Sequence, residues 1–203
     1  MATPDPRLPR LGRGRSRRTG HGRRARRLRW RRSSPRRTGG NAVSVYEDVA
    51  EFRSALPATG ALMGLDLGTK TIGLALSDGL RGVATAMRTH KRTKFGVDAQ
   101  ALLAAGEERQ VTGIVLGLPR NMDGSEGPRA QSTRAFARNL MGLTELPITF
   151  WDERLSTIAA ERALLAADAS RARRAEVIDS VAASYILQGL LDRLHHMEHD
   201  DER

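Results

Sequence analysis

The chain has 203 residues and no cysteine, which excludes disulfides, thiol catalysis and thiolate zinc sites and fits the reducing cytoplasm in which we expect it. Its formal net charge of +11 comes from one segment. Residues 1–40 hold 15 arginines and a single acid, Asp5, giving +14, whereas the remaining 163 residues carry −3. The overall charge therefore does not establish nucleic-acid binding by the main part of the chain.

Residues 1–43 are predicted to be a disordered, arginine-rich extension. Aliphatic residues are scarce there, so the segment cannot bury enough surface to offset its ordering entropy. Three interpretations are open: a nucleic-acid-binding arm, an organelle-targeting peptide, or upstream sequence read through in error, with the true start near Val43 or Val45. We favour the last. No apolar run resembles a secretory signal or a membrane span, so we expect no membrane association.

The first regular elements are predicted between residues 61 and 88. Apolar runs at 61–65 and 71–77 flank a turn that contains Gly68, and this pattern is typical of a β-hairpin. A third strand is predicted at 82–88. The three strands would form an antiparallel meander.

Strands and helices alternate after residue 96. The predicted elements are a helix at 97–109, a strand at 111–116, a helix from Pro128 to about Met141, a strand at 147–151, a helix capped by Ser156 or Thr157, a polar hinge at 171–174 and a long helix at 176–195. This order predicts an α/β domain at 44–197, with an RNase H-like mixed five-stranded sheet and helices on both faces. A disordered tail is expected at 198–203.

Acidic residues occur where these elements end or pack. Asp66 closes the first strand, where it could meet a phosphate or simply accept hydrogen bonds from the turn. Asp152 and Glu153 follow the strand at 147–151, and because neighbouring strand side chains point to opposite faces, at most one can join Asp66. Asp179 lies on the apolar stripe of the last helix, where a carboxylate is costly unless it is paired, metal-bound or able to reach solvent.

Two polar segments could contact a substrate. Residues 117–128 follow a predicted strand end, are rich in Gly, Asn and Asp, and form a longer connection than is typical. Their role is either that of a binding loop or that of an ordinary connection. The arginines at 171, 173 and 174 could meet a phosphate backbone or form a solvated hinge.

As a set, these motifs resemble those of the YqgF family, RNase H-like and Holliday-junction-resolvase-like proteins described as pre-16S ribosomal RNA nucleases. The similarity runs from about Leu62 to Leu191. It rests on four motifs in the family's order, namely DLGTKTIG from Asp66, GLPRNMDG from Gly117, DERLST from Asp152 and DSVAA from Asp179. One departure is that RRAEVI replaces the family's lysine-rich run before the last of these acids.

The resemblance implies a metal-dependent nuclease that processes the 5′ end of pre-16S rRNA. Its acidic trio maps onto Asp66, Glu153 and Asp179, although Asp152 remains an alternative to Glu153. Hard oxygen ligands favour two Mg²⁺ or Mn²⁺ ions at this trio. The expected substrate-binding residues are Lys70, Asn121, Arg154 and Arg174.

The motifs are also compatible with other functions. A Holliday-junction-resolvase-like DNA endonuclease would use the same chemistry on branched DNA, and a non-catalytic assembly factor would bind RNA without cutting it. An actin-like ATPase is suggested by residues 66–69 alone, but the chain is too short for the second domain that such an enzyme needs. The sequence leaves open RNA against DNA, endonuclease against exonuclease, and the oligomeric state.

Overall fold

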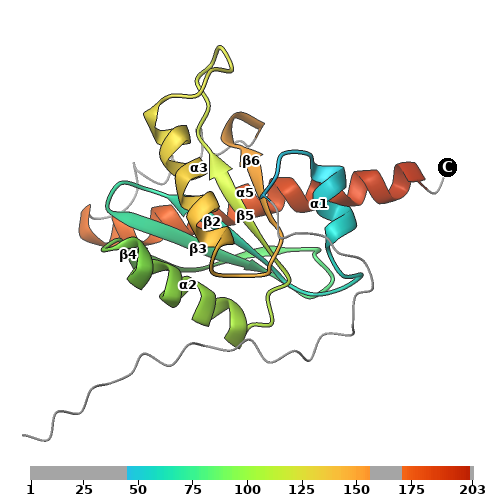
Figure 1. The fold of residues 1–203 in the computed structure, drawn as a ribbon, viewed down its shortest axis with the longest axis horizontal. Helices are drawn as coiled ribbons and strands as arrows, with labels where there is room; N and C mark the ends of the chain where they lie inside the picture. Colours follow the sequence, from blue (N-terminus) through green and yellow to red (C-terminus); the bar gives the residue numbers. More distant parts are fainter. Residues whose placement is uncertain (1–44, 156–170, 202–203) are drawn as a thin grey trace, which may run out of the picture. The chain divides into compact units, whose positions relative to one another are not determined.

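A mixed sheet forms the centre of the structure, a computed structural model that describes residues 45–155 and 171–201, with side chains at 45–155 and 178–200 (Figure 1). Its strands are β1 (Val45–Tyr46), β2 (Leu62–Leu67), β3 (Thr71–Ser77), β4 (Ala84–Lys91), β5 (Gly113–Leu118) and β6 (Ile148–Asp152). They lie in the order β1-β6-β5-β2-β3-β4.

The strand directions confirm the predicted fold class. β2, β3 and β4 form an antiparallel meander, and β5 and β6 follow parallel to β2. The sheet has six strands rather than five because Val45 and Tyr46 pair with the open edge of β6. A two-residue strand carries no periodic signal of its own, and its pairing depends on the hydrogen-bonding groups that an edge strand exposes.

Helices cover both faces of the sheet, as predicted. The described helices are α1 (Val49–Ala55), α2 (Phe95–Glu108), α3 (Pro128–Met141) and α5 (Arg171–Asp201), and a 3-10 turn, η1, spans Glu153–Leu155. α2 and α3 pack on one face, and α1 and α5 on the other. The sequence analysis missed α1. The residue before it, Asp48, caps the helix, because its carboxylate accepts hydrogen bonds from the backbone N–H groups of Ala50 and Glu51.

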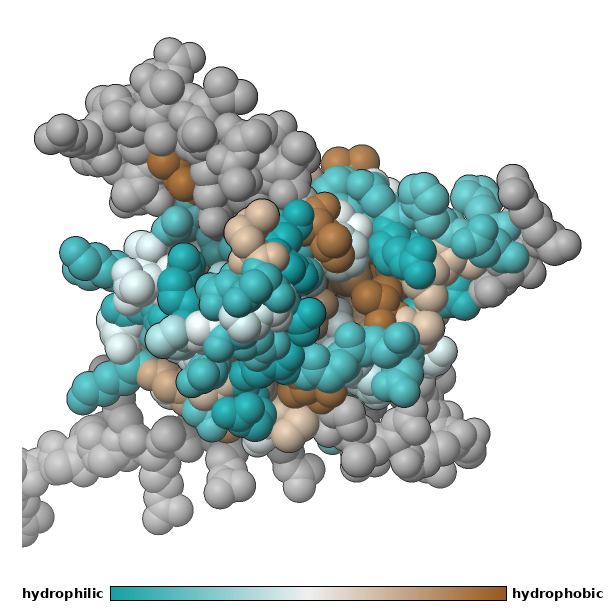
Figure 2. Space-filling model, turned by 90° about the horizontal axis from the view of Figure 1, so that it is seen from above, coloured by the Kyte–Doolittle hydropathy of each residue, from teal (hydrophilic) through white to brown (hydrophobic). Residues whose placement is uncertain are grey.

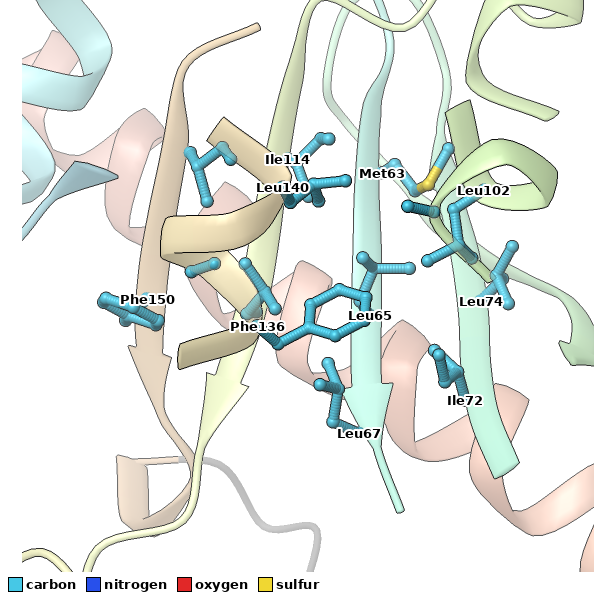
Figure 3. Close-up of a cluster of buried hydrophobic side chains, with 14 of the residues drawn as sticks. Met63, Leu65, Leu67, Ile72, Leu74, Leu102, Ile114, Phe136, Leu140 and Phe150 are labelled. Carbon is cyan, nitrogen blue, oxygen red and sulfur yellow. The ribbon is translucent and has the colours of Figure 1, made fainter. Parts of the chain in front are cut away.

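The larger core cluster lies under α2 and α3 (Figure 3). In β2, Met63, Leu65 and Leu67 point into it, so the residues between them must point to the face covered by α5. Ile114, Leu116 and Leu118 do the same in β5, and all of these side chains are buried. Each such aliphatic side chain contributes roughly 1.5–3 kcal/mol on burial.

α5 lies close against the opposite face of the sheet. Its small residues Ala182 and Ala183 are buried, and an added Cβ at Gly64 of β2 would lie 2.8 Å from the carbonyl oxygen of Ala183. Because glycine lacks a Cβ and alanine has only a methyl group, the backbone of α5 can approach the backbone of the sheet closely. This close approach fixes where Asp179 sits along the sheet.

Several predicted boundaries were wrong. α5 runs from 171 to 201, so the predicted hinge at 171–174 is helical, as are four residues of the tail predicted at 198–203. A helix anchored by its buried middle continues through local hydrogen bonds, which need no core contact at its ends. The third strand ends at Lys91 rather than at 88.

Some predictions lie outside the described residues. They are the disordered extension at 1–43, the helix cap at Ser156 or Thr157 and the side chain of Arg174. In the part of the chain that the structure describes, no helix combines the length and apolar character needed to span a bilayer.

Candidate active site

Asp66 lies near the end of β2 on the face covered by α5. Its neighbours Leu65 and Leu67 point into the opposite core cluster, so alternation along the strand directs the carboxylate toward α5. The residue is 3% exposed. A carboxylate in such a position costs folding free energy unless cations or hydrogen bonds compensate it.

The contact between β3 and α5 brings Asp179 to the same place. Gly73 pairs with Asp66 across the β2–β3 ladder, and a Cβ added to Gly73 would lie 1.8 Å from the backbone oxygen of Asp179. Only a glycine permits this approach. Thr71, two residues earlier, donates a hydrogen bond of 2.5 Å to Asp179 Oδ2 and so fixes that carboxylate.

Glu153 reaches the same face from the end of β6. A Cβ added to Gly117 of β5 would lie 2.8 Å from Glu153 Oε1 and 2.4 Å from Ile186 Cδ1 of α5. Because Leu116 pairs with Leu65 in the parallel ladder, Gly117 is the next residue beside Asp66. Asp66, Glu153 and Asp179 therefore border one end of the sheet on one face.

The three carboxylates are near one another without forming a tight cluster. Within the described residues, no three side chains of types that bind metals stand close enough to hold an ion as they are. Carboxylates held close together repel one another, and a divalent cation bound among them would offset that repulsion. At Gly73 and Gly117 the missing Cβ lets the Asp179 backbone and the Glu153 carboxylate approach the strands, which brings both residues to the end of the sheet that carries Asp66.

Asp152 faces the other side of the sheet. It pairs with Leu118, whose side chain lies in the α2/α3 cluster, and it receives hydrogen bonds from the Arg154 side chain at 2.7 to 3.1 Å. These hydrogen bonds, together with the charge of Arg120 3.7 Å away, hold the pKa of Asp152 below its usual value despite partial burial. The alternation predicted from the sequence therefore separates Asp152 from the face that carries Glu153.

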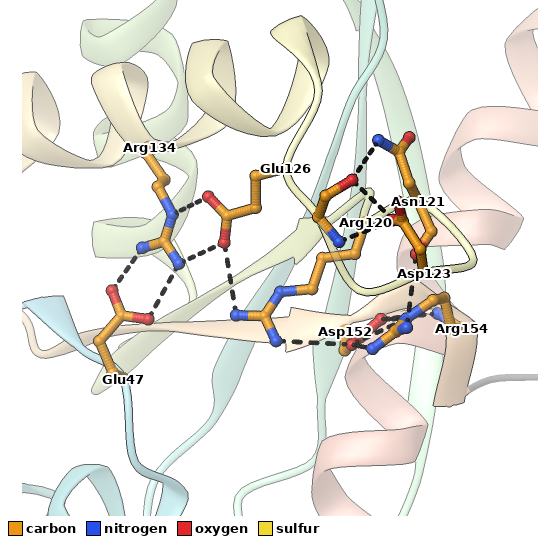
Figure 4. Close-up of polar contacts among 9 residues, drawn as sticks. Glu47, Arg120, Asn121, Asp123, Glu126, Arg134, Asp152 and Arg154 are labelled. Atoms are coloured by element: carbon orange, nitrogen blue, oxygen red, sulfur yellow. Dashed lines mark hydrogen bonds and ion pairs between the residues drawn. The ribbon is translucent and has the colours of Figure 1, made fainter.

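A chain of ion pairs connects the 119–127 loop to the sheet (Figure 4). Arg134 of α3 forms ion pairs with Glu47 and, at 2.6 Å, with Glu126. Arg120 forms ion pairs with Glu126, at 3.4 Å, and with Asp152. Hydrogen bonds from Arg134 lower the pKa of Glu126. Acids and bases alternate along this chain, so each charge has an opposite neighbour.

The tip of the same loop has its own hydrogen bonds. Asp123 Oδ1 accepts from the backbone and hydroxyl of Ser125, and Asn121 Nδ2 contacts Ser125 Oγ at 2.9 Å. Gly124 has a φ of 87°, which favours glycine. Seen from above, the side from which this loop projects is mostly hydrophilic (Figure 2).

The four residues expected to contact substrate are placed differently from one another. Lys70 is exposed in the turn after β2, and Asn121 is exposed in the loop. The guanidinium of Arg154 holds Asp152 and lies 3.4 Å from the carbonyl oxygens of Asn121 and Met122. A role for these side chains in substrate contact stays a prediction, as it does for Arg174.

The comparison with known families agrees with this arrangement. A family model described as RuvX: Holliday junction resolvase matches residues 60–193. The chain belongs to the RuvX family. This result confirms the resemblance to the YqgF family, which is the same family under another name.

Curated RuvX relatives match most of the chain. Proteins named "Putative pre-16S rRNA nuclease" are 73% identical over 150 residues in Paracoccus denitrificans and 69% identical over 153 residues in Ruegeria pomeroyi. The matches cover 74% and 75% of this chain and 95% and 99% of those relatives.

Solved structures show more distant likeness. Thermus thermophilus RuvC in complex with a Holliday junction substrate aligns with a TM-score of 0.45 at 10% identity, over 67% of this chain and 96% of the RuvC chain. Another Thermus thermophilus RuvC structure gives a TM-score of 0.41 at 14% identity, over 66% and 96% of the two chains. Alignments at this level do not bear on the site.

Three residues of this candidate site were missed by the sequence analysis. Thr71 was treated only as part of a strand, yet it fixes Asp179. Gly73 and Gly117 were not recognised as the positions at which α5 and Glu153 approach the sheet. A glycine inside an apolar strand is a local signal for close approach, and it could have marked both positions.

Proposed function

We propose that this protein is a divalent-metal-dependent nuclease that processes the 5′ end of pre-16S rRNA. The observation that carries the proposal is the placement of Asp66, Glu153 and Asp179, from three separate elements, at one end and on one face of the sheet. The names of the RuvX relatives support the substrate.

The acidic trio fits Mg²⁺ or Mn²⁺ better than softer metals. All three side chains offer carboxylate oxygens, the donors that these hard cations prefer, and the chain has no thiolate to offer. Asp66, Glu153 and Asp179 would hold two ions. When bound, such ions lower the pKa of an attacking water and stabilise the leaving oxygen of a phosphodiester.

The protein's own residues prepare this site. Thr71 fixes the carboxylate of Asp179 through its hydrogen bond. Because Gly73 and Gly117 have no Cβ, the α5 backbone at Asp179 packs directly against β3, and the Glu153 carboxylate packs directly against β5. Lys70, exposed in the turn beside Asp66, would offset negative charge on the phosphate in the transition state.

Branched DNA is the second candidate substrate. The matching family model is described as a Holliday junction resolvase, and the same two-ion chemistry would serve either nucleic acid. The decisive assay compares cleavage of pre-16S rRNA fragments and of four-way DNA junctions, each with and without Mg²⁺ or Mn²⁺. Metal-dependent cutting at the 5′ end of the 16S sequence is the expected result.

A thermal shift tests the metal site independently of cleavage. Binding at a free ion concentration 100 times Kd stabilises the folded state by about 2.7 kcal/mol, which corresponds to a rise in Tm of roughly 5–11 °C for a domain of this size. Asp66→Asn and Glu153→Gln should lose both this rise and cleavage. The matched control, Asp123→Asn in the exposed loop, should keep both.

Two results would contradict the proposal. Cleavage of RNA by Asp66→Asn at the wild-type rate would exclude the two-ion mechanism at this site. Retained RNA binding with no cleavage under any metal would instead identify a non-catalytic assembly factor.

A further inference from the structure

All the lysines of this chain lie in one region. The chain has three, Lys70, Lys91 and Lys94. Together with Arg92 they form a group that we name the basic corner. Lys70 lies in the turn between β2 and β3, and the other three span the end of β4 and the segment leading to α2. Only Lys70 was singled out in the sequence analysis, since the others lie far from the acidic motifs along the chain.

Hydrogen bonds bring the parts of the basic corner together. The backbone N–H of Arg92 donates to the carbonyl of Lys70 at 2.8 Å, and Arg92 Nη1 donates to the carbonyl of Gly68 at 2.6 Å. The turn after Asp66 is therefore tied to the end of β4. This connection places the group at the same end of the sheet as the acidic trio.

Lys91 lies on the same sheet face as the acids. It pairs directly with Thr71 in the antiparallel ladder, and side chains of directly opposed residues project from the same face. Thr71 is the residue that donates to Asp179. Adjacent strands are about 4.8 Å apart, so the stem of Lys91 begins one strand away from the threonine that fixes a site carboxylate.

The basic corner differs in its ion pairing from the other cationic side chains near the site. Arg120, Arg134 and Arg154 are each paired with an acid. By contrast, in the ranges with described side chains, 45–155 and 178–200, no ion pair joins any member of the basic corner to an acid. The three lysines are exposed, and the nearby Asp98 is 2% exposed and committed to His90 and Thr93.

A cavity of about 180 Å³ continues this surface toward α3. Thr69 and Arg92 line one side, and Arg129 and Ser132 of α3 line the other. It adds a fifth cation, Arg129, and the hydroxyl groups of Thr69 and Ser132 to the same end of the sheet. Like charges placed together destabilise the folded state and attract anions, which a body of net charge −3 otherwise repels.

We propose that the basic corner binds the phosphodiester backbone of the substrate strand on the β4 side of the acidic trio. This inference rests on the proposed nuclease function and adds the path of the strand beside the site. Lys91 would contact the phosphate adjoining the site, and Arg92 and Lys94 would hold phosphates beyond it. Contacts of this kind position a strand and carry no sequence information.

The salt dependence of binding tests this assignment. The full chain carrying Asp66→Asn is used, so that equilibrium binding to a pre-16S fragment is measured without cleavage. Adding Lys91→Gln and Lys94→Gln should reduce the slope of log K against log salt by about 1 for each lost contact. At about 0.1 M salt the corresponding loss of affinity is roughly 10- to 100-fold.

Arg109→Gln with Arg193→Gln is the matched control. Both arginines are exposed and lie outside the basic corner, and this pair removes the same charge. The arginine-rich residues 1–40 are present in every variant, so their contribution cancels. An equal effect of the two pairs would overturn the proposal, because it would show that only net charge matters.

Cross-linking provides a second measurement that does not depend on affinity. Because the chain lacks cysteine, Lys91→Cys and Arg109→Cys each create a single labelling position. A photoactivated label at position 91 should cross-link to the bound nucleic acid, and one at position 109 should not. Cross-linking from position 109 alone would overturn the assigned path, whereas absence of cleavage by the wild type would count only against the nuclease proposal.

Discussion

Gly73→Ala should separate α5 from the sheet at the point where Asp179 packs against β3, on the residue paired with Asp66. The added Cβ would lie 1.8 Å from the carbonyl oxygen and 2.2 Å from the carbonyl carbon of Asp179, both in the helix backbone. Distances below 3.0 Å are not tolerated, so the helix must move by about an ångström. Backbone cannot rotate aside as a side chain can.

The expected loss of stability is at the upper end of the range for overpacking. Such insertions cost about 1–3 kcal/mol, occasionally more, and we expect about 3 kcal/mol because the obstacle is backbone. For a domain of this size that lowers Tm by roughly 6–12 °C. Thermal melts with and without Mn²⁺ measure both the fold and the site, and the variant should also lose the Mn²⁺-dependent rise because Asp179 is displaced.

Two other glycines calibrate the result. Gly96→Ala, in the first turn of α2 with nothing within 4 Å of its new Cβ, should stabilise the protein by up to about 1 kcal/mol. Gly117→Ala meets only the ends of the Ile186 and Glu153 side chains, so it should cost less than Gly73→Ala yet still weaken Mn²⁺ binding. If Gly73→Ala melts within about 1 °C of the wild type, α5 does not pack on β3 there, and the placement of Asp179 beside the strand pair that carries Asp66 is refuted.

Two further predictions concern hydrogen-bonded carboxylates. Thr71→Val should reduce kcat by roughly 10-fold, equivalent to about 1.4 kcal/mol, because Asp179 loses its hydrogen-bond donor. Thr71→Ser, which keeps the hydroxyl, should restore kcat. An unchanged single-turnover rate in Thr71→Val would contradict this role. Burial would raise the pKa of Asp98, but hydrogen bonds from His90 and Thr93 outweigh it and hold the pKa below the usual 3.8. The stability contributed by ionised Asp98 is therefore present above pH 3.8 and is lost as pH falls through the folded-state pKa. Asp98→Asn should lower Tm at pH 7 and flatten the acid-induced fall in Tm below about pH 4, and a parallel fall in both proteins would show that other groups dominate.

The sequence by itself determined the type and order of most elements. Alternating apolar runs predicted the hairpin of β2 and β3, and Pro128 marked the first residue of α3. Helical spacing placed Asp179 on the stripe of Ala182 and Ile186, both of which are buried. These features depend on periodicities that each segment carries within itself, which is why they can be read without knowing its neighbours.

Tertiary structure decided which of these groups meet. The Asp152–Arg154 contact is local, between residues two apart, but the positions of Asp152 opposite Leu118 and of Glu153 beside Gly117 depend on the register of β6 against β5. The pairing of Lys91 with Thr71 likewise depends on the β3–β4 register, which joins residues distant along the chain. Local sequence sets a side chain's direction within its own strand, whereas the face of the sheet that it occupies, and the partner that it finds there, follow from non-local packing.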